Sequence, residues 1–133
     1  MDDGPITKVI LVAEDNAINQ FLVERMIARC GYSSRVAING EELLVAYNES
    51  RPALILMDVQ MPLMDGLSAT REIRKLEAVS GERVPIIATT ARALDGDAKA
   101  CLDSGMDDYI SKPIRYEILA AKLALWLAIS EAA

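Results

Sequence analysis

The segment KVILVAED, residues 8–15, is a short aliphatic run that stops at two adjacent acids. Two later segments have the same plan: ALILMD, residues 53–58, ends at an aspartate, and VPIIATT, residues 84–90, ends at two threonines. Short and nearly continuous aliphatic runs are typical of strands that are buried on both faces of a parallel sheet. We therefore predict three central strands, at 8–13, 53–57 and 84–89, each followed by polar residues.

The segments between these runs have helical spacing. Ile18, Leu22 and Met26 repeat at intervals of four residues, and Gly31 follows where a helix would end. Turn residues indicate four further helix starts, at 39–40, 65–66, 95–96 and 113. Two weaker strand candidates lie at 34–37 and 108–111. Alternating strands and helices joined by right-handed crossovers predict an α/β fold, a doubly wound five-stranded parallel sheet of order 2-1-3-4-5 with five helices.

Composition limits the partners of the chain. The 133 residues, 52% of them hydrophobic, fit one folded domain over residues 1–133. The formal net charge of −6 disfavours binding to phosphate backbones, so we expect no nucleic-acid partner. The apolar runs are shorter than the roughly 18 residues that span a bilayer, so we expect no membrane partner. Cys30 and Cys101 lack the spacing of a redox motif, which favours buried thiols in a reducing compartment over a disulfide and indicates a cytoplasmic location.

Polar residues stand where the predicted strands end. In a sheet of this order, ligands bind beyond the carboxyl ends of the strands, at the point where the strand order reverses. Five residues that are far apart in the sequence would meet at this edge: Glu14, Asp15, Asp58, Thr90 and Lys112. We therefore predict that the functional site lies there.

Three acids at one sheet edge indicate a metal site. Mg²⁺ takes hard oxygen ligands in octahedral geometry and keeps several waters. We predict that Asp15 and Asp58 bind Mg²⁺ directly, that Glu14 acts through water, and that the backbone carbonyl of Gln60 supplies a further oxygen. Mn²⁺ would be able to replace Mg²⁺ in such a site.

The same edge suits phosphoryl transfer to a carboxylate, which needs a nucleophile, a metal, and a cation or hydroxyl that holds the remaining oxygens. Asp58 is the predicted nucleophile, and Lys112 and Thr90 would bind phosphoryl oxygens. Each residue also has a plainer interpretation: Glu14-Asp15 as charges at a helix N-terminus, and Lys112 as a solvated loop residue. Their convergence on one edge favours a phospho-acceptor.

Four motifs together resemble the receiver domain of two-component response regulators, the CheY-like proteins with a flavodoxin-like fold. They are LVAEDNAINQ at 11–20, LILMDVQMPLMDG at 54–66, PIIATTARA at 85–93 and GMDDYISKPI at 105–114, and the resemblance covers about residues 8–128. It implies a signalling domain rather than an enzyme, in which Asp58 accepts phosphate from a phosphohistidine. The donor would be a histidine kinase or a histidine phosphotransfer domain.

The chain contains no histidine, so the phosphohistidine must belong to another protein or another domain, unless a small molecule is the donor. The form EDNxxNQ and the position of Trp126 are similar to receivers attached to hybrid kinases. The sequence leaves open whether the chain is such a receiver or a stand-alone regulator.

The resemblance also implies how the signal would be read. Thr90 and Tyr109 would form a switch in which the tyrosine ring rotates inward when phosphate draws the Thr90 hydroxyl. Gln60 and Arg92, two residues past Asp58 and Thr90, would tune the lifetime of the phosphate. The fourth helix, the strand at 108–111 and the helix at 116–127 would form the output face of a monomer or weak homodimer.

Three other functions remain open from the sequence. A phosphatase of the haloacid dehalogenase type also uses a strand-end aspartate, but it has a second acid where this chain has Gln60. A flavodoxin-like cofactor binder would have a Ser/Thr/Gly-rich loop after the first strand, where EDNAIN would repel a phosphate without a metal. A scaffold that keeps the fold without phosphorylation would share every motif.

Overall fold

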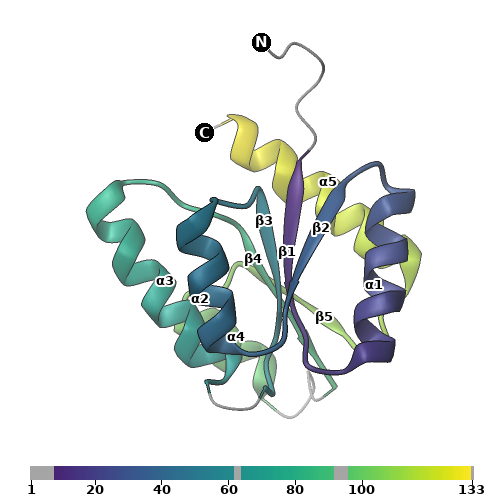
Figure 1. Cartoon of the computed structure of the whole chain (residues 1–133), viewed down its shortest axis with the longest axis horizontal. Helices are drawn as coiled ribbons and strands as arrows, with labels where there is room; N and C mark the ends of the chain where they lie inside the picture. Colours follow the sequence, from purple (N-terminus) through teal and green to yellow (C-terminus); the bar gives the residue numbers. More distant parts are fainter. Residues whose placement is uncertain (1–7, 62–63, 92–95, 133) are drawn as a thin grey trace.

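The computed structural model describes residues 8–61, 64–91 and 96–132. Its sheet contains five parallel strands in the order β2-β1-β3-β4-β5 (Figure 1). The strands are β1 (Val9–Ala13), β2 (Ser33–Ala37), β3 (Leu54–Asp58), β4 (Ile86–Thr90) and β5 (Asp108–Ser111). The predicted doubly wound sheet and its strand order are therefore confirmed.

Helices cover both faces of the sheet. They are α1 (Ala17–Arg29), α2 (Gly40–Glu49), α3 (Gly66–Ser80), α4 (Asp97–Ser104) and α5 (Tyr116–Ala132). Figure 1 shows α1 and α5 on one face and α2, α3 and α4 on the other. No helix in the described ranges combines the length and the apolar content that crossing a membrane requires.

Each face of the sheet has its own hydrophobic core, because successive residues of a strand point to opposite faces. In β1, Leu11 and Ala13 belong to the core under α2, α3 and α4, whereas Ile10 and Val12 belong to the core under α1 and α5. Burial on both faces explains why the central strands are aliphatic at nearly every position.

Polar side chains cap the starts of the first three helices. The side-chain oxygens of Asn16, Asn39 and Asp65 accept hydrogen bonds from the first turns of α1, α2 and α3 at 3.0, 2.8 and 2.8 Å. Gly31 follows the end of α1 with a φ of +93°, in the left-handed region that glycine adopts without strain. Asp95, at the predicted start of the fourth helix, lies outside the described residues.

Element boundaries differ from the prediction by one residue in β1, β2 and β3, and by more at the start of β4 and the end of α5. Strand β4 begins at Ile86 rather than at residue 84, because Pro85 has no N–H to donate to a ladder. Helix α5 continues to Ala132, five residues beyond the predicted end at residue 127, because no proline or glycine interrupts it.

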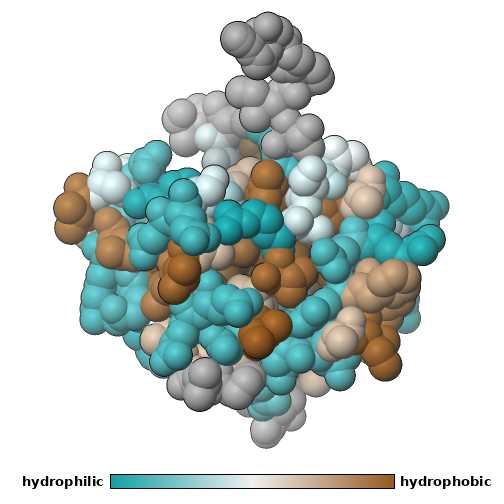
Figure 2. Space-filling model, viewed as in Figure 1, coloured by the Kyte–Doolittle hydropathy of each residue, from teal (hydrophilic) through white to brown (hydrophobic). Residues whose placement is uncertain are grey.

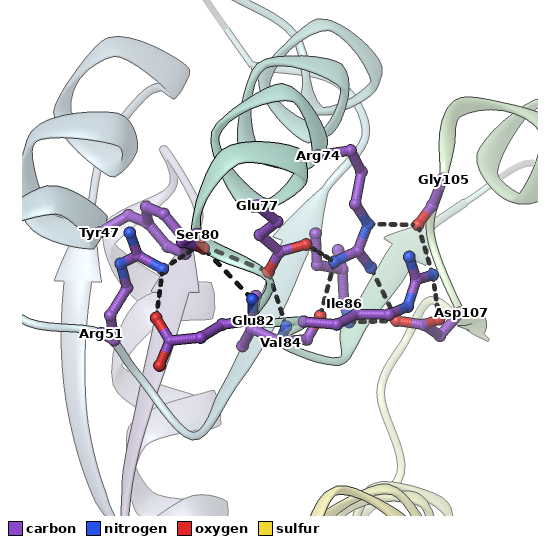
Figure 3. A network of polar contacts seen from close by, with 11 residues as sticks. Tyr47, Arg51, Arg74, Glu77, Ser80, Glu82, Val84, Ile86, Gly105 and Asp107 are labelled. Atoms are coloured by element: carbon purple, nitrogen blue, oxygen red, sulfur yellow. Dashed lines mark hydrogen bonds and ion pairs between the residues drawn. The ribbon is translucent and has the colours of Figure 1, made fainter. Parts of the chain in front are cut away.

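A polar network joins the helix α3 to the starts of β4 and β5, at the sheet edge opposite the predicted site (Figure 3). The buried carboxylate of Glu77 accepts a hydrogen bond from the Val84 N–H at 2.7 Å and pairs with Arg74. Arg74 also pairs with Asp107 at 2.9 Å, and Asp107 accepts the Ile86 N–H at 2.9 Å. These carboxylates satisfy backbone donors at the point where Pro85 interrupts the pattern of the strand.

Replacing Glu77 with alanine should lower the free energy of unfolding by about 3 kcal/mol, because it leaves part of the partly buried Arg74 charge and the Val84 N–H without a partner. Urea unfolding followed by circular dichroism would measure the loss. Glu72→Ala is the matched control on the same helix, since Glu72 makes only an exposed pair with Lys75. It should change stability by less than about 0.5 kcal/mol. Equal losses in the two variants would contradict a structural role for the network.

Candidate functional site

Three carboxylates meet at the carboxyl ends of β1 and β3. Glu14 and Asp15 directly follow β1, Asp58 ends β3, and one oxygen from each lies within 4.8 Å of the others. The strand register explains this meeting, because Ala13 stands opposite Met57 and the next residues along both strands are acids. Glu14 and Asp58 are only 4% and 5% exposed, whereas Asp15 lies at the solvent-exposed rim.

Lys112 reaches this acidic group from the connection between β5 and α5. Its Nζ atom lies 3.2 Å from Asp58 Oδ2 and 3.4 Å from Glu14 Oε1. Its backbone N–H donates to the Thr90 carbonyl at 2.8 Å, and its peptide bond to Pro113 is cis. The structure therefore brings together the acids and the ammonium that the sequence predicts at one edge of the sheet.

The donor set fits Mg²⁺. The pKa of the Glu14 carboxyl is raised above its usual value, chiefly by burial and also by the nearby Asp58 charge. A hydrogen bond from the Asn16 N–H and the Lys112 ammonium oppose this rise. A divalent cation relieves this kind of crowding, and carboxylate oxygens are the ligands that Mg²⁺ prefers. Asp15 and Asp58 as direct ligands, Glu14 through water and the Gln60 carbonyl remain predictions.

The other predicted residues surround the acids at different depths. Thr90 ends β4 and is buried, with Thr89 opposite Asp58 in the neighbouring strand. The Gln60 backbone N–H donates to Asp58 Oδ1 at 3.1 Å, and the residue is exposed. Tyr109, on β5, is 36% exposed. Arg92 lies outside the described residues.

Two contacts at the site were not predicted from the sequence. The side-chain amide of Gln20, on α1, donates to the Glu14 carbonyl at 2.7 Å. A Cβ atom on Gly66 would collide with the Asp58 carbonyl, so glycine is required where α3 begins beside β3. Both residues stand in motifs of the sequence: Gln20 ends EDNAINQ, which we used to indicate a receiver of the hybrid-kinase type, and Gly66 ends MDG, which we used to indicate a helix start.

Comparison with known families gives one match over most of the chain. The profile of the family described as "Response regulator receiver domain" matches residues 10–124. The chain is 40% identical over 131 residues to "Hybrid signal transduction histidine kinase I" of Dictyostelium discoideum, covering 92% of this chain and 8% of that protein. It is 41% identical over 115 residues to the peroxide stress-activated histidine kinase mak1 of Schizosaccharomyces pombe, covering 84% and 7%. The chain thus spans less than a tenth of the length of these relatives.

Solved structures have the same fold. The receiver domain of sensor histidine kinase PA1611 from Pseudomonas aeruginosa PAO1, crystallised with a magnesium ion in its active site cleft, is 41% identical with a TM-score of 0.84, covering 92% of this chain and 99% of that one. The receiver domain of Saccharomyces cerevisiae Ssk1, co-crystallised with the histidine phosphotransfer protein Ypd1, is 32% identical with a TM-score of 0.86, covering 92% and 90%.

Mg²⁺ should raise the melting temperature of the chain, because binding to the folded state relieves the repulsion among the three acids. At a concentration one hundred times the dissociation constant, linkage adds about 2.7 kcal/mol to the free energy of unfolding. Asp15→Asn should lose most of this increment. Thermal unfolding in EDTA and in Mg²⁺ would measure it, with Asp103→Asn, an exposed acid on α4, as the control that keeps it. An equal increment in wild type and Asp15→Asn would rule out Asp15 as a ligand.

Proposed function

Because the chain belongs to the family of response regulator receiver domains, we propose that it accepts a phosphoryl group on Asp58 in a two-component or phosphorelay signalling system. The observation that carries this proposal is the position of the Lys112 ammonium, 3.2 Å from Asp58 Oδ2, beside a second buried acid. An aspartate at a strand end has many uses, but one held between an ammonium and two further carboxylates suits a phosphoryl acceptor that works with a divalent cation.

The transfer step follows from the arrangement around Asp58. A carboxylate oxygen of Asp58 attacks the phosphorus of the donor phosphohistidine. The O–P bond forms as the P–N bond breaks, and the electron pair of that bond leaves with the imidazole nitrogen. Lys112 shifts its contact from Asp58 to a phosphoryl oxygen, and the Thr90 hydroxyl donates to another. Mg²⁺, when bound by the acids, supplies positive charge against the phosphoryl oxygens.

We propose that the chain is a signalling domain and not an enzyme with a separate substrate, since the group that it modifies is its own Asp58. It would promote only its own phosphorylation and slow dephosphorylation. We propose one receiver domain over residues 1–133 with a core at 8–128, and the family match over residues 10–124 supports that core. Relatives named as hybrid signal transduction histidine kinases support a receiver that serves a kinase of this kind. Cys30 and Cys101 are not joined in a disulfide, which supports a reducing, cytoplasmic compartment.

We propose that the phosphohistidine donor docks on an apolar surface of α1 made by Ile18, Phe21 and Leu22. These side chains are between 47% and 70% exposed, and Figure 2 shows brown side chains over the part of α1 nearest the site. Beside them lies a cavity of 390 Å³ whose lining includes Leu22, Lys112 and Pro113. A donor that brings its histidine over Asp58 must cover this rim. Ypd1 bound to the Ssk1 receiver is a precedent for a donor of the phosphotransfer class.

We propose that the output face is formed by α4, β5 and α5, with Thr90 and Tyr109 as its switch. Tyr109 has room to move because it is partly exposed, with the Lys122 ammonium 5.9 Å from the centre of its ring. Ile118 and Leu125 of α5 are also exposed, which suits protein contact by a monomer or a weak homodimer. Gln60, exposed next to Asp58, and Arg92 would tune how long the phosphate persists.

Intact mass after incubation with acetyl phosphate tests the acceptor directly. The wild-type chain should gain one phosphoryl group in Mg²⁺ and none in EDTA, and Asp58→Asn should gain none in either. Asp103→Asn, which changes an acid of the same type far from the site, should be labelled like wild type. Unlabelled wild type, under conditions that label another receiver, would favour the scaffold that works without phosphorylation.

Transfer from phosphorylated Ypd1, used as a probe donor, tests the docking surface. Phe21→Ala should slow this transfer roughly tenfold, the effect of losing about 1.4 kcal/mol at an interface hot spot. Labelling by acetyl phosphate should stay unchanged, because that small donor needs no docking surface. Val79→Ala removes an exposed apolar side chain from α3, on the other face of the sheet, and should leave both rates unchanged. A normal rate for Phe21→Ala with Ypd1 would count against this surface.

A further inference from the structure

One residue of α1 holds the loop that carries Glu14 and Asp15. The side-chain amide of Gln20 donates to the Glu14 carbonyl at 2.7 Å, and its backbone N–H donates to the Asn16 carbonyl at 2.9 Å. Asn16 in turn begins α1, where its side chain accepts the Asn19 N–H at 3.0 Å. The side chain and the backbone of Gln20 therefore fasten the two ends of a three-residue loop to the helix.

The Glu14 carbonyl takes this hydrogen bond because it lies beyond the paired strands. The register between β1 and β2 ends with Ala13 opposite Ala37, and the Glu14 N–H still donates to the Ala37 carbonyl at 2.9 Å. After Ala37 the chain turns toward α2, which begins at Gly40. A backbone carbonyl at a partly buried position needs a partner, and Gln20 supplies one from the neighbouring helix.

This hydrogen bond also acts on the next residue, Asp15. The Glu14 carbonyl and the Asp15 N–H belong to one planar peptide unit, so fixing the carbonyl fixes the direction in which Asp15 leaves the strand. Asp15 contributes one of the three carboxylates that lie within 4.8 Å of one another. Like charges at this distance repel, so the exposed Asp15 carboxylate is driven away from the two buried acids, by rotation of its side chain or of the peptide that precedes it. The hydrogen bond from Gln20 restrains the second of these movements.

We infer that Gln20 is a positioning residue for the metal site: its amide holds the peptide between Glu14 and Asp15 so that the Asp15 carboxylate already faces Glu14 and Asp58 when the cation arrives. The role concerns affinity for Mg²⁺ and does not depend on phosphorylation. Residues that orient metal ligands through hydrogen bonds typically contribute roughly 10-fold to 100-fold to metal affinity.

Titration calorimetry with Mg²⁺ tests this role on the whole chain. Gln20→Met keeps the length and the helix propensity of the side chain and removes only the amide, so the variant should fold. Its dissociation constant for Mg²⁺ should be roughly 10-fold higher than that of wild type. Gln20→Leu removes the same donor with a different shape and should weaken binding in the same way. Glu24→Met, one turn further along α1, is the matched control and should bind like wild type.

Melting temperatures in EDTA separate positioning from a purely structural role. The inference predicts that the Gln20 variants are folded in EDTA and lose Mg²⁺ affinity, whereas a structural role would lower the melting temperature and leave the dissociation constant unchanged. Folded variants with wild-type affinity would overturn the inference. The inference rests on the proposed metal site, and a wild-type chain that binds no Mg²⁺ would overturn that site. This outcome is distinguishable from a failure of the Gln20 inference alone, because it is seen in the wild type before any substitution is made.

Discussion

Repulsion among three carboxylates is the constraint on which the rest of this site depends. Glu14 and Asp58 are buried side by side because neighbouring strands place them in register, and the sheet cannot separate them without losing its ladder hydrogen bonds. The raised pKa of Glu14 is one consequence of its burial. Another consequence is that binding of a cation of suitable size among the three carboxylates lowers the free energy of the folded chain. The fold thus stores unfavourable electrostatic energy at one edge, and binding releases it.

Lys112 links this repulsion to the proposed phosphoryl transfer. Its ammonium lies 3.4 Å from Glu14 Oε1 and 3.2 Å from Asp58 Oδ2, where it offsets part of the repulsion between the two acids. A divalent cation among the acids and a phosphoryl group on Asp58, as proposed above, would change that balance, because the cation would neutralise the acids and new negative charge would appear further out. One flexible ammonium can serve both states since its partners lie on the same side of the sheet. In the proposed function, the site would therefore need no large rearrangement to accept phosphate.

Strand order, the two cores and the helix starts could be predicted from the sequence because they depend on periodicity and on turn residues. Glu14, Asp15, Asp58 and Lys112 could be predicted to meet because the topology brings the strand ends together. The contact of Gln20 with the Glu14 carbonyl could not, since it depends on the rotamer of one side chain and on where the ladder stops. The start of β4 differs from the prediction because Pro85 has no N–H for a ladder and because the Glu77 side chain of α3 accepts the Val84 N–H at 2.7 Å, a contact that the sequence pattern does not contain.

The two edges of the sheet have opposite roles. At the amino edge, Arg74, Glu77 and Asp107 pair opposite charges and satisfy backbone donors, so this edge resists opening. At the carboxyl edge, like charges are held together and remain ready for a cation. The acids on β1 and β3 cannot separate without breaking the ladder between these two strands, so their geometry is set before a cation binds. One sheet thus carries paired opposite charges at its amino edge and strained like charges at its carboxyl edge, where the surrounding structure supports the strain.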